Sequence, residues 1–147
     1  MTVIAWDGKK ISVDRRMVRG DIGFDAEKFL ECDDGTILFS AGVLTRGREL
    51  MAWHLKRDEG MEFPSSNKDD DLVTILIVAK PGEGVWVYED APFGEDFTKI
   101  YPMAWGSGEA SAMGAMFNGA DSCTACKIAA SIHVTCGGEI DTFEVFP

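Results

Sequence analysis

The stretch MTVIAWDGKKISVDRR occupies residues 1–16. Residues 2–6 are β-prone, and Asp7-Gly8 is a strong signal for a tight hairpin turn. The alternating residues 11–14 are expected to form the returning strand. Thr2 therefore stands at the head of a strand, directly behind the initiator methionine. It can be an ordinary β-branched strand residue, or it can become the amino terminus and act through both its hydroxyl and its free amine.

Length and composition favour one soluble globular domain over residues 1–147, with 46% hydrophobic residues. The longest apolar run covers residues 72–79, too short for a membrane span of about 20 residues. No secretory signal is visible, so we expect a cytoplasmic protein of bacterial or phage origin with four free thiols. The net charge of −11 argues against nucleic acid as a partner, because phosphate contacts need clustered Lys and Arg.

Patterning along the chain indicates hairpins with helices placed between them, which favours an α+β fold over a parallel sheet. Helical periodicity runs from Val43 to about Glu59, over 107–118 and over 122–132, the last with Asp121 as its N-cap. Gly20 to Gly23 is expected to be a connection, and residues 60–71 a polar loop. Strands are expected at 2–6, 11–14, 24–32, 36–40, 72–79, 85–88, 97–103 and 141–146.

Five local features follow one another in a fixed order. They are Thr2, Asp14, Lys28 (in EKF, 27–29), Ala41-Gly42, and the GSG of residues 106–108 that opens a helix; CGG follows at 136–138. In this order the chain resembles the proteasome β-subunit family, including bacterial HslV and the short proteasome-like proteins of phages and bacteria. The resemblance covers most of the chain. It implies the four-layer αββα sandwich of N-terminal nucleophile hydrolases.

The chemistry that the resemblance implies suits these residues. A Thr hydroxyl needs a base to take its proton, and a free α-amine with a pKa of roughly 7.7 to 8 can serve. Thr2 would thus be nucleophile and base together. Lys28 would keep the amine neutral, and Asp14 would pair with Lys28. Gly42 would supply the oxyanion donor, and Ser107 would assist proton movement.

Each of these residues also has a purely structural interpretation. Lys28 and Asp14 can be surface or turn residues, Gly42 can be a tight turn, and Ser107 can simply cap its helix. The sequence departs from the family in two places as well. Alignment on Gly137-Gly138 puts His133 and Cys136 where the family has Asp and Ser or Thr, so both are expected to line the site in altered roles. The second helix of the usual pair after Ala-Gly is expected to be missing, which shortens one helical layer and calls the usual ring assembly into question.

Other interpretations of the same residues are open. Cys123, Cys126, His133 and Cys136 are suitable zinc ligands, but the first pair falls inside a predicted helix, where packing is the simpler role. We expect no metal and no cofactor. The leading hypothesis is a threonine peptidase that hydrolyses amide bonds in peptides or unfolded protein, as a homo-oligomer; the sequence does not identify an ATPase partner. The alternatives are a catalytically silent scaffold for self-assembly or protein binding, and a small-molecule amidase.

Removal of Met1 is the first testable consequence. A free amine at Thr2 requires it, and methionine is usually removed before a residue as small as Thr. The intact mass of protein from its native host should therefore equal that of a chain beginning at Thr2. Full retention of Met1 in that protein would exclude the mechanism, because a blocked amine cannot accept the hydroxyl proton.

Overall fold

The computed structural model describes residues 2–65 and 73–147. Its strands form two larger sheets and one separate hairpin, with every pairing antiparallel. The first sheet has the order β10 (Met103–Gly106), β1 (Val3–Trp6), β2 (Lys10–Asp14), β11 (Ile140–Glu144). The second has the order β5 (Phe29–Glu31), β6 (Ile37–Ala41), β7 (Ile75–Lys80), β8 (Gly84–Tyr88), β9 (Glu95–Asp96). The hairpin joins β3 (Arg16–Arg19) to β4 (Ile22–Asp25).

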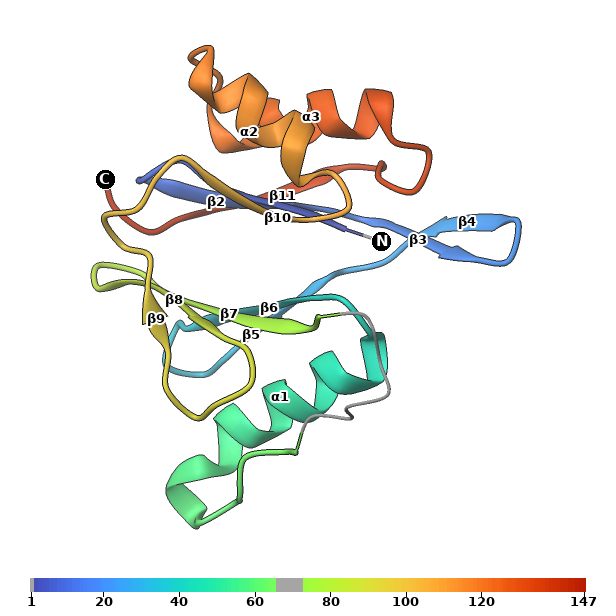
Figure 1. Cartoon of the computed structure of the whole chain (residues 1–147). Coiled ribbons are helices and arrows are strands. Elements are labelled where there is room, and N and C mark those ends of the chain that lie inside the picture. The colour runs from blue at the N-terminus through green and yellow to red at the C-terminus, as the bar shows by residue number, and fades with distance from the viewer. Residues whose placement is uncertain (1, 66–72) are drawn as a thin grey trace.

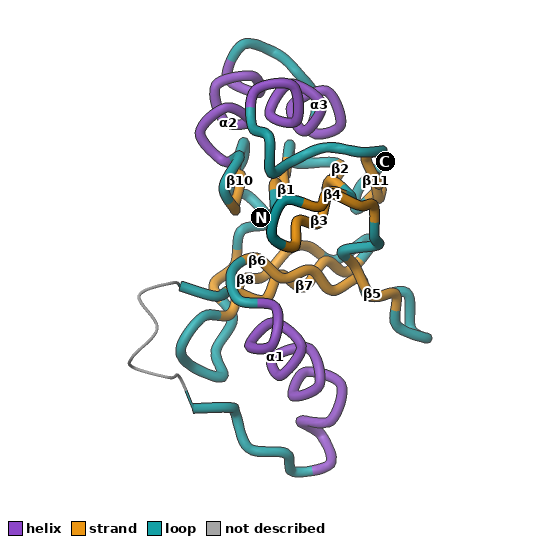
Figure 2. Tube along the Cα trace, turned by 90° about the vertical axis from the view of Figure 1, so that its right-hand side faces the viewer, coloured by secondary structure: helices purple, strands orange, loops and turns teal. Residues whose placement is uncertain are grey.

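Helices cover the outer faces of the two sheets, which face each other (Figure 1). Helices α2 (Glu109–Phe117) and α3 (Ser122–Ile132) lie on the first sheet, and α1 (Leu44–Lys56) lies on the second. Figure 2 shows the same order of layers after a turn of 90° about the vertical axis. The α+β prediction is confirmed. No helix among the described residues is long and apolar enough to cross a membrane.

Strand β1 is buried along its whole length, between β10 and β2. Its side chains alternate between two cores, as the period of two in a strand requires. Ile4 and Trp6 pack between the sheets, whereas Val3 and Ala5 pack beneath α2 and α3. The registers of β1 with β10 and with β2 are therefore fixed, because a shift of one residue would turn the side chains of each core toward the other core. Thr2 is held at the end of this central strand.

Several sequence-predicted elements differ from the structure. Residues 97–102 are not a strand; Phe97 instead packs on the inter-sheet core, and its carbonyl accepts a hydrogen bond from Trp6 Nε1 at 3.0 Å. The expected connection at 20–23 is the turn and the first residues of β4. Lys28 lies in irregular backbone just before β5 rather than on a strand. The predicted strand 72–79 is observed as Ile75–Lys80, and residue 72 lies outside the described residues.

The faces of the helices were predicted only in part. Helix α3 has the predicted bounds, and Asp121 caps it by accepting from the Thr124 amide at 2.8 Å. The periodicity of residues 107–118 predicted one apolar face made of Ala110, Met113, Gly114 and Phe117. Helix α2 instead buries Ala112 and Met116, and of the predicted face only Met113 packs against the core. After α1, the described residues up to 65 contain a short 3₁₀ turn (Arg57–Glu59) and no second α-helix.

His54 lies where α1 meets the second sheet. Its ring is 6.3 Å from that of Trp53 and 6.2 Å from that of Tyr88, measured between centroids. Within the described residues its buried Nδ1 has no hydrogen-bond partner. Burial lowers the pKa of His54, and the nearby Arg57 cation lowers it further. The folded protein therefore favours the neutral imidazole.

This environment predicts a pH-dependent contribution to stability. The contribution is complete above the unfolded pKa of about 6.5 and is lost as pH falls through the lower folded pKa. The free energy of unfolding should drop between pH 7.5 and pH 5.5, and it should drop less in His54→Phe. Urea unfolding at both pH values measures the difference. The contribution of His133 is the same in both proteins and cancels in the comparison. An equal drop in the free energy of unfolding in wild type and in His54→Phe would show that His54 is not the cause.

Candidate active site

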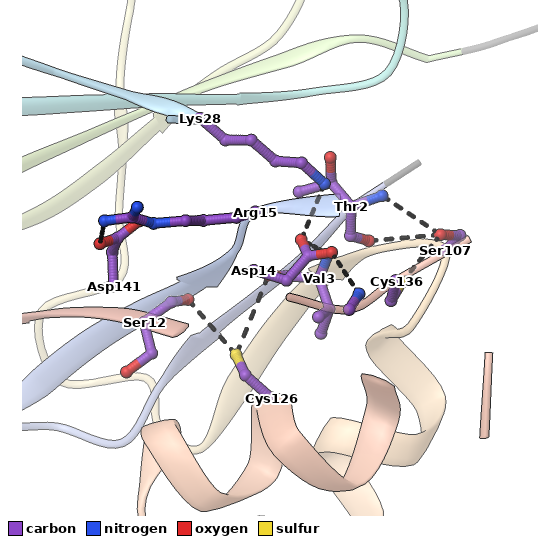
Figure 3. A network of polar contacts seen from close by, with 11 residues as sticks. Thr2, Val3, Ser12, Asp14, Arg15, Lys28, Ser107, Cys126, Cys136 and Asp141 are labelled. Atoms are coloured by element: carbon purple, nitrogen blue, oxygen red, sulfur yellow. Dashed lines mark hydrogen bonds and ion pairs between the residues drawn. The ribbon is translucent and has the colours of Figure 1, made fainter. Parts of the chain in front are cut away.

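The loop between β10 and α2 holds Thr2 by its main chain. The Thr2 N–H donates to Ser107 Oγ at 3.3 Å, and Ser107 Oγ donates to the Thr2 carbonyl at 3.3 Å (Figure 3). The Gly108 N–H donates to the same carbonyl at 3.3 Å. Gly106 has φ of +99°, and a Cβ there would collide with the Thr2 carbonyl. Glycine is therefore required for this close approach.

Asp14 ends β2, and its side chain is completely buried. One carboxylate oxygen, Oδ1, accepts from the Val3 N–H at 3.2 Å and from Lys28 Nζ at 2.9 Å. The other, Oδ2, accepts from the Gly137 N–H at 2.9 Å. The Lys28 side chain is only 5% exposed, so both charges of this ion pair are withdrawn from water. The pair places a cation beside the first residues of β1 (Figure 3).

Two cysteines lie close to this pair. Cys136 is buried, with its Sγ 3.5 Å from Ser107 Oγ. Cys126 on α3 donates to the Ser12 carbonyl at 3.5 Å, and burial raises its pKa, with Asp14 contributing after burial. The cysteines are free thiols. Among the described residues, no group of three or more His, Cys, Asp or Glu is arranged to hold a metal ion.

His133 is oriented differently from the other predicted site residues. Its Nε2 lies 2.9 Å from Ser111 Oγ, and it lines a third cavity, which does not include Thr2, together with Arg16, Cys136 and Gly137. The structure thus brings together Thr2, Asp14, Lys28, Ser107 and Cys136, whereas the side chain of His133 contacts Ser111.

The sequence analysis did not identify two residues that hold the site together. The Gly137 N–H donates to Asp14, whereas the sequence analysis used Gly137 only to align the chain with the proteasome family. Arg15 forms a two-point ion pair with Asp141, at 2.7 and 2.8 Å, which ties β2 to β11 next to Asp14. No local pattern marks this pair, because its members are far apart in the chain.

Gly42 lies at the junction of two cavities that both reach Thr2. One, of about 480 Å³, extends toward Lys28, Phe24 and Leu44. The other, of about 500 Å³, extends toward Trp105 and Val73. Gly42 has φ of +117°, and a Cβ there would meet the backbone of residues 73 and 74. Helix α1 begins two residues later, at Leu44, so Gly42 precedes the helix rather than opening it.

Comparisons with known proteins bear on the fold. No family model matches the sequence, and no curated protein matches it closely enough to count as a relative. Among solved structures, eukaryotic HslV from Trypanosoma brucei is 19% identical, covers 99% of both chains and has a TM-score of 0.65. BPH from Thiobacillus denitrificans is 18% identical over 100% of both chains, with a TM-score of 0.67. A second BPH structure, in complex with epoxomicin, is 19% identical over 100% of both chains and has a TM-score of 0.64.

At this level of identity the likeness establishes the fold. The chain has the fold of HslV and BPH. Its structural neighbours match along the full length of the chain.

The buried ion pair predicts a large loss of stability in Lys28→Met. Removal of the ammonium leaves the Asp14 carboxylate buried with two backbone donors and no cation, which typically costs about 3 to 5 kcal/mol. Urea unfolding of Lys28→Met against wild type measures the loss. Lys127→Met is the matched control, because Lys127 is exposed and should change stability by less than about 0.5 kcal/mol. Equal stability of both variants would show that the pair is unimportant.

Proposed function

We propose that this protein is a proteasome-like threonine peptidase that hydrolyses amide bonds through Thr2 after removal of Met1. One observation carries the proposal: the nitrogen of Thr2 is held by Ser107 at the end of a buried strand, beside a buried Asp14–Lys28 pair. A structural Thr needs neither of these neighbours. A nucleophile that uses its own amine needs both a fixed amine and an adjacent positive charge.

The first step forms a tetrahedral intermediate. Thr2 Oγ bonds to the substrate carbonyl carbon, its proton passes to the α-amine, and the π electrons of the carbonyl move to its oxygen, which becomes the oxyanion. Lys28 keeps that amine unprotonated beforehand and stabilises the developing alkoxide. We assign the stabilisation of the oxyanion to the Gly42 N–H, at the junction of the two cavities. Removal of one such donor typically costs about 3 kcal/mol of transition-state stabilisation.

The ester forms in the second step. The carbon–nitrogen bond of the intermediate breaks, the α-ammonium gives its proton to the leaving nitrogen, and the acyl group stays on Thr2 Oγ. Water then attacks the ester, its proton passes to the α-amine, and the Thr2 hydroxyl is regenerated when the ester bond breaks. Ser107 Oγ contacts both the nitrogen and the carbonyl of Thr2, so it is placed to relay these protons.

Cys136 and His133 distinguish this site from the pattern of the family. Cys136 contacts Ser107 with a thiol, a weaker hydrogen-bond partner than a hydroxyl, so we expect it to orient Ser107 less firmly. His133 contacts Ser111 and takes no direct part in the proposed reaction. This orientation of His133 favours the second candidate, a catalytically silent scaffold for self-assembly or protein binding.

We further propose peptides or unfolded protein as substrates and a cytoplasmic homo-oligomer as the working form. Support comes from the HslV-type fold and from the resemblance of the sequence to the proteasome family. The proposal names no ATPase partner.

Substitution of Thr2 tests the catalytic assignment. Thr2→Ala should lower cleavage of an unfolded protein such as casein by at least roughly a thousandfold, because it removes the nucleophile. Thr2→Ser keeps a hydroxyl and should retain measurable cleavage. Ala, Ser and Thr are all small, so Met1 should be removed equally from the three proteins, which intact mass verifies.

Two outcomes would contradict the assignment. Cleavage by Thr2→Ala at the wild-type rate would place the nucleophile elsewhere. A wild-type protein that begins at Thr2 yet cleaves nothing, and forms the same oligomer as Thr2→Ala, would support the scaffold instead. Epoxomicin, which is bound in one BPH structure, provides an independent probe and should inhibit wild-type cleavage.

A further inference from the structure

Among the residues that the structure describes, the two cavities at the site have Thr2 and Gly42 in common. We call them the Leu44 cavity and the Trp105 cavity, each after a residue that lines it and not the other. The Leu44 cavity also contains Met17, Phe24, Lys28 and Met51. The Trp105 cavity also contains Val73, Ile75, Ser107 and Glu109. Each is large enough to receive a side chain of a peptide.

The proposed reaction gives the two cavities different roles. A carbonyl attacked by Thr2 Oγ carries its acyl part on one side and its leaving nitrogen on the other. The leaving nitrogen must receive a proton from the Thr2 amine, which is bound by Ser107. Ser107 lines the Trp105 cavity and is not part of the Leu44 cavity. The leaving side of the substrate must therefore point toward the Trp105 cavity.

We propose that the Trp105 cavity is a specificity subsite for the residue that follows the scissile bond. This inference rests on the proposed peptidase function. The acyl side of the substrate then lies in the Leu44 cavity, next to Lys28.

The lining of the Trp105 cavity defines the residue that it accepts. Trp105 is almost fully buried and its ring contacts that of Phe97 edge to face at 5.5 Å, so this wall is rigid. Ile75 is half-buried and packs against the same core, and Val73 is exposed. Aliphatic and aromatic walls favour a large apolar side chain.

Glu109 adds a charge to this lining. It is exposed in the first turn of α2. Its carboxylate would repel an acidic residue in the cavity. The subsite therefore accepts large apolar residues after the cut and excludes Asp and Glu.

Cleavage profiling tests the subsite. Protein that begins at Thr2 is incubated with a diverse peptide mixture, and all products are sequenced by mass spectrometry and aligned on the cut. Large apolar residues should be enriched directly after the cut and acidic residues depleted. In Val73→Glu, apolar residues after the cut should be processed about tenfold less efficiently and Lys or Arg more efficiently, with the preference before the cut unchanged.

Leu44→Glu is the matched control, because Leu44 is a half-exposed apolar residue of the other cavity only. It should alter the preference before the cut and leave the position after the cut unchanged. Cleavage without selection after the cut, or a reversed pattern in the two variants, would overturn the subsite while leaving the peptidase function intact. No cleavage by the wild-type protein would overturn both.

Discussion

The carboxylate of Asp14 is the interaction on which the rest of the arrangement depends. Its three donors come from β1, from the segment before β5 and from the turn after α3, so one buried side chain joins the first sheet to the segment that leads into the second sheet and to the turn after a helix. A buried carboxylate requires this full set of partners, since its desolvation would otherwise oppose folding. The requirement that stabilises the charge also fixes Lys28 beside the start of β1.

The same constraint explains why the site lies at the end of a completely buried strand. Strand β1 cannot shift its register without exchanging its two cores, so Thr2 has a single position relative to β10 and the glycine-containing loop. Ser107 and Gly108 hold its main chain, which leaves the side chain of Thr2 to face the cavities. Core packing therefore fixes the position of the proposed nucleophile, and the loop adds only short-range contacts.

Sequence patterns predicted what is encoded locally. The hairpin at Asp7-Gly8 and the Asp121 cap depend on neighbouring residues, and both are present. The face of helix α2 was predicted wrongly because alanine, glycine and methionine lie on several sides of the helix, and its packing against α3, β1 and β10 selects the buried side. Residues 97–102 were predicted as a strand from their apolar side chains, but none of them is part of a strand. His133 was predicted to line the site from its position in the sequence alignment alone, which contains no information on the backbone at the end of α3. Its contact with Ser111 depends on the packing of α2 against α3.

The burial of β1 also bears on when the proposed removal of Met1 could occur. Thr2 is only 9% exposed and Val3 is completely buried, so the folded protein does not present these two residues as accessible extended chain. An exopeptidase that trims the precursor must bind the residues on both sides of the bond it cuts. The removal of Met1 that we propose would therefore compete kinetically with closure of the first sheet, and it would have to take place while the nascent chain is still emerging from the ribosome.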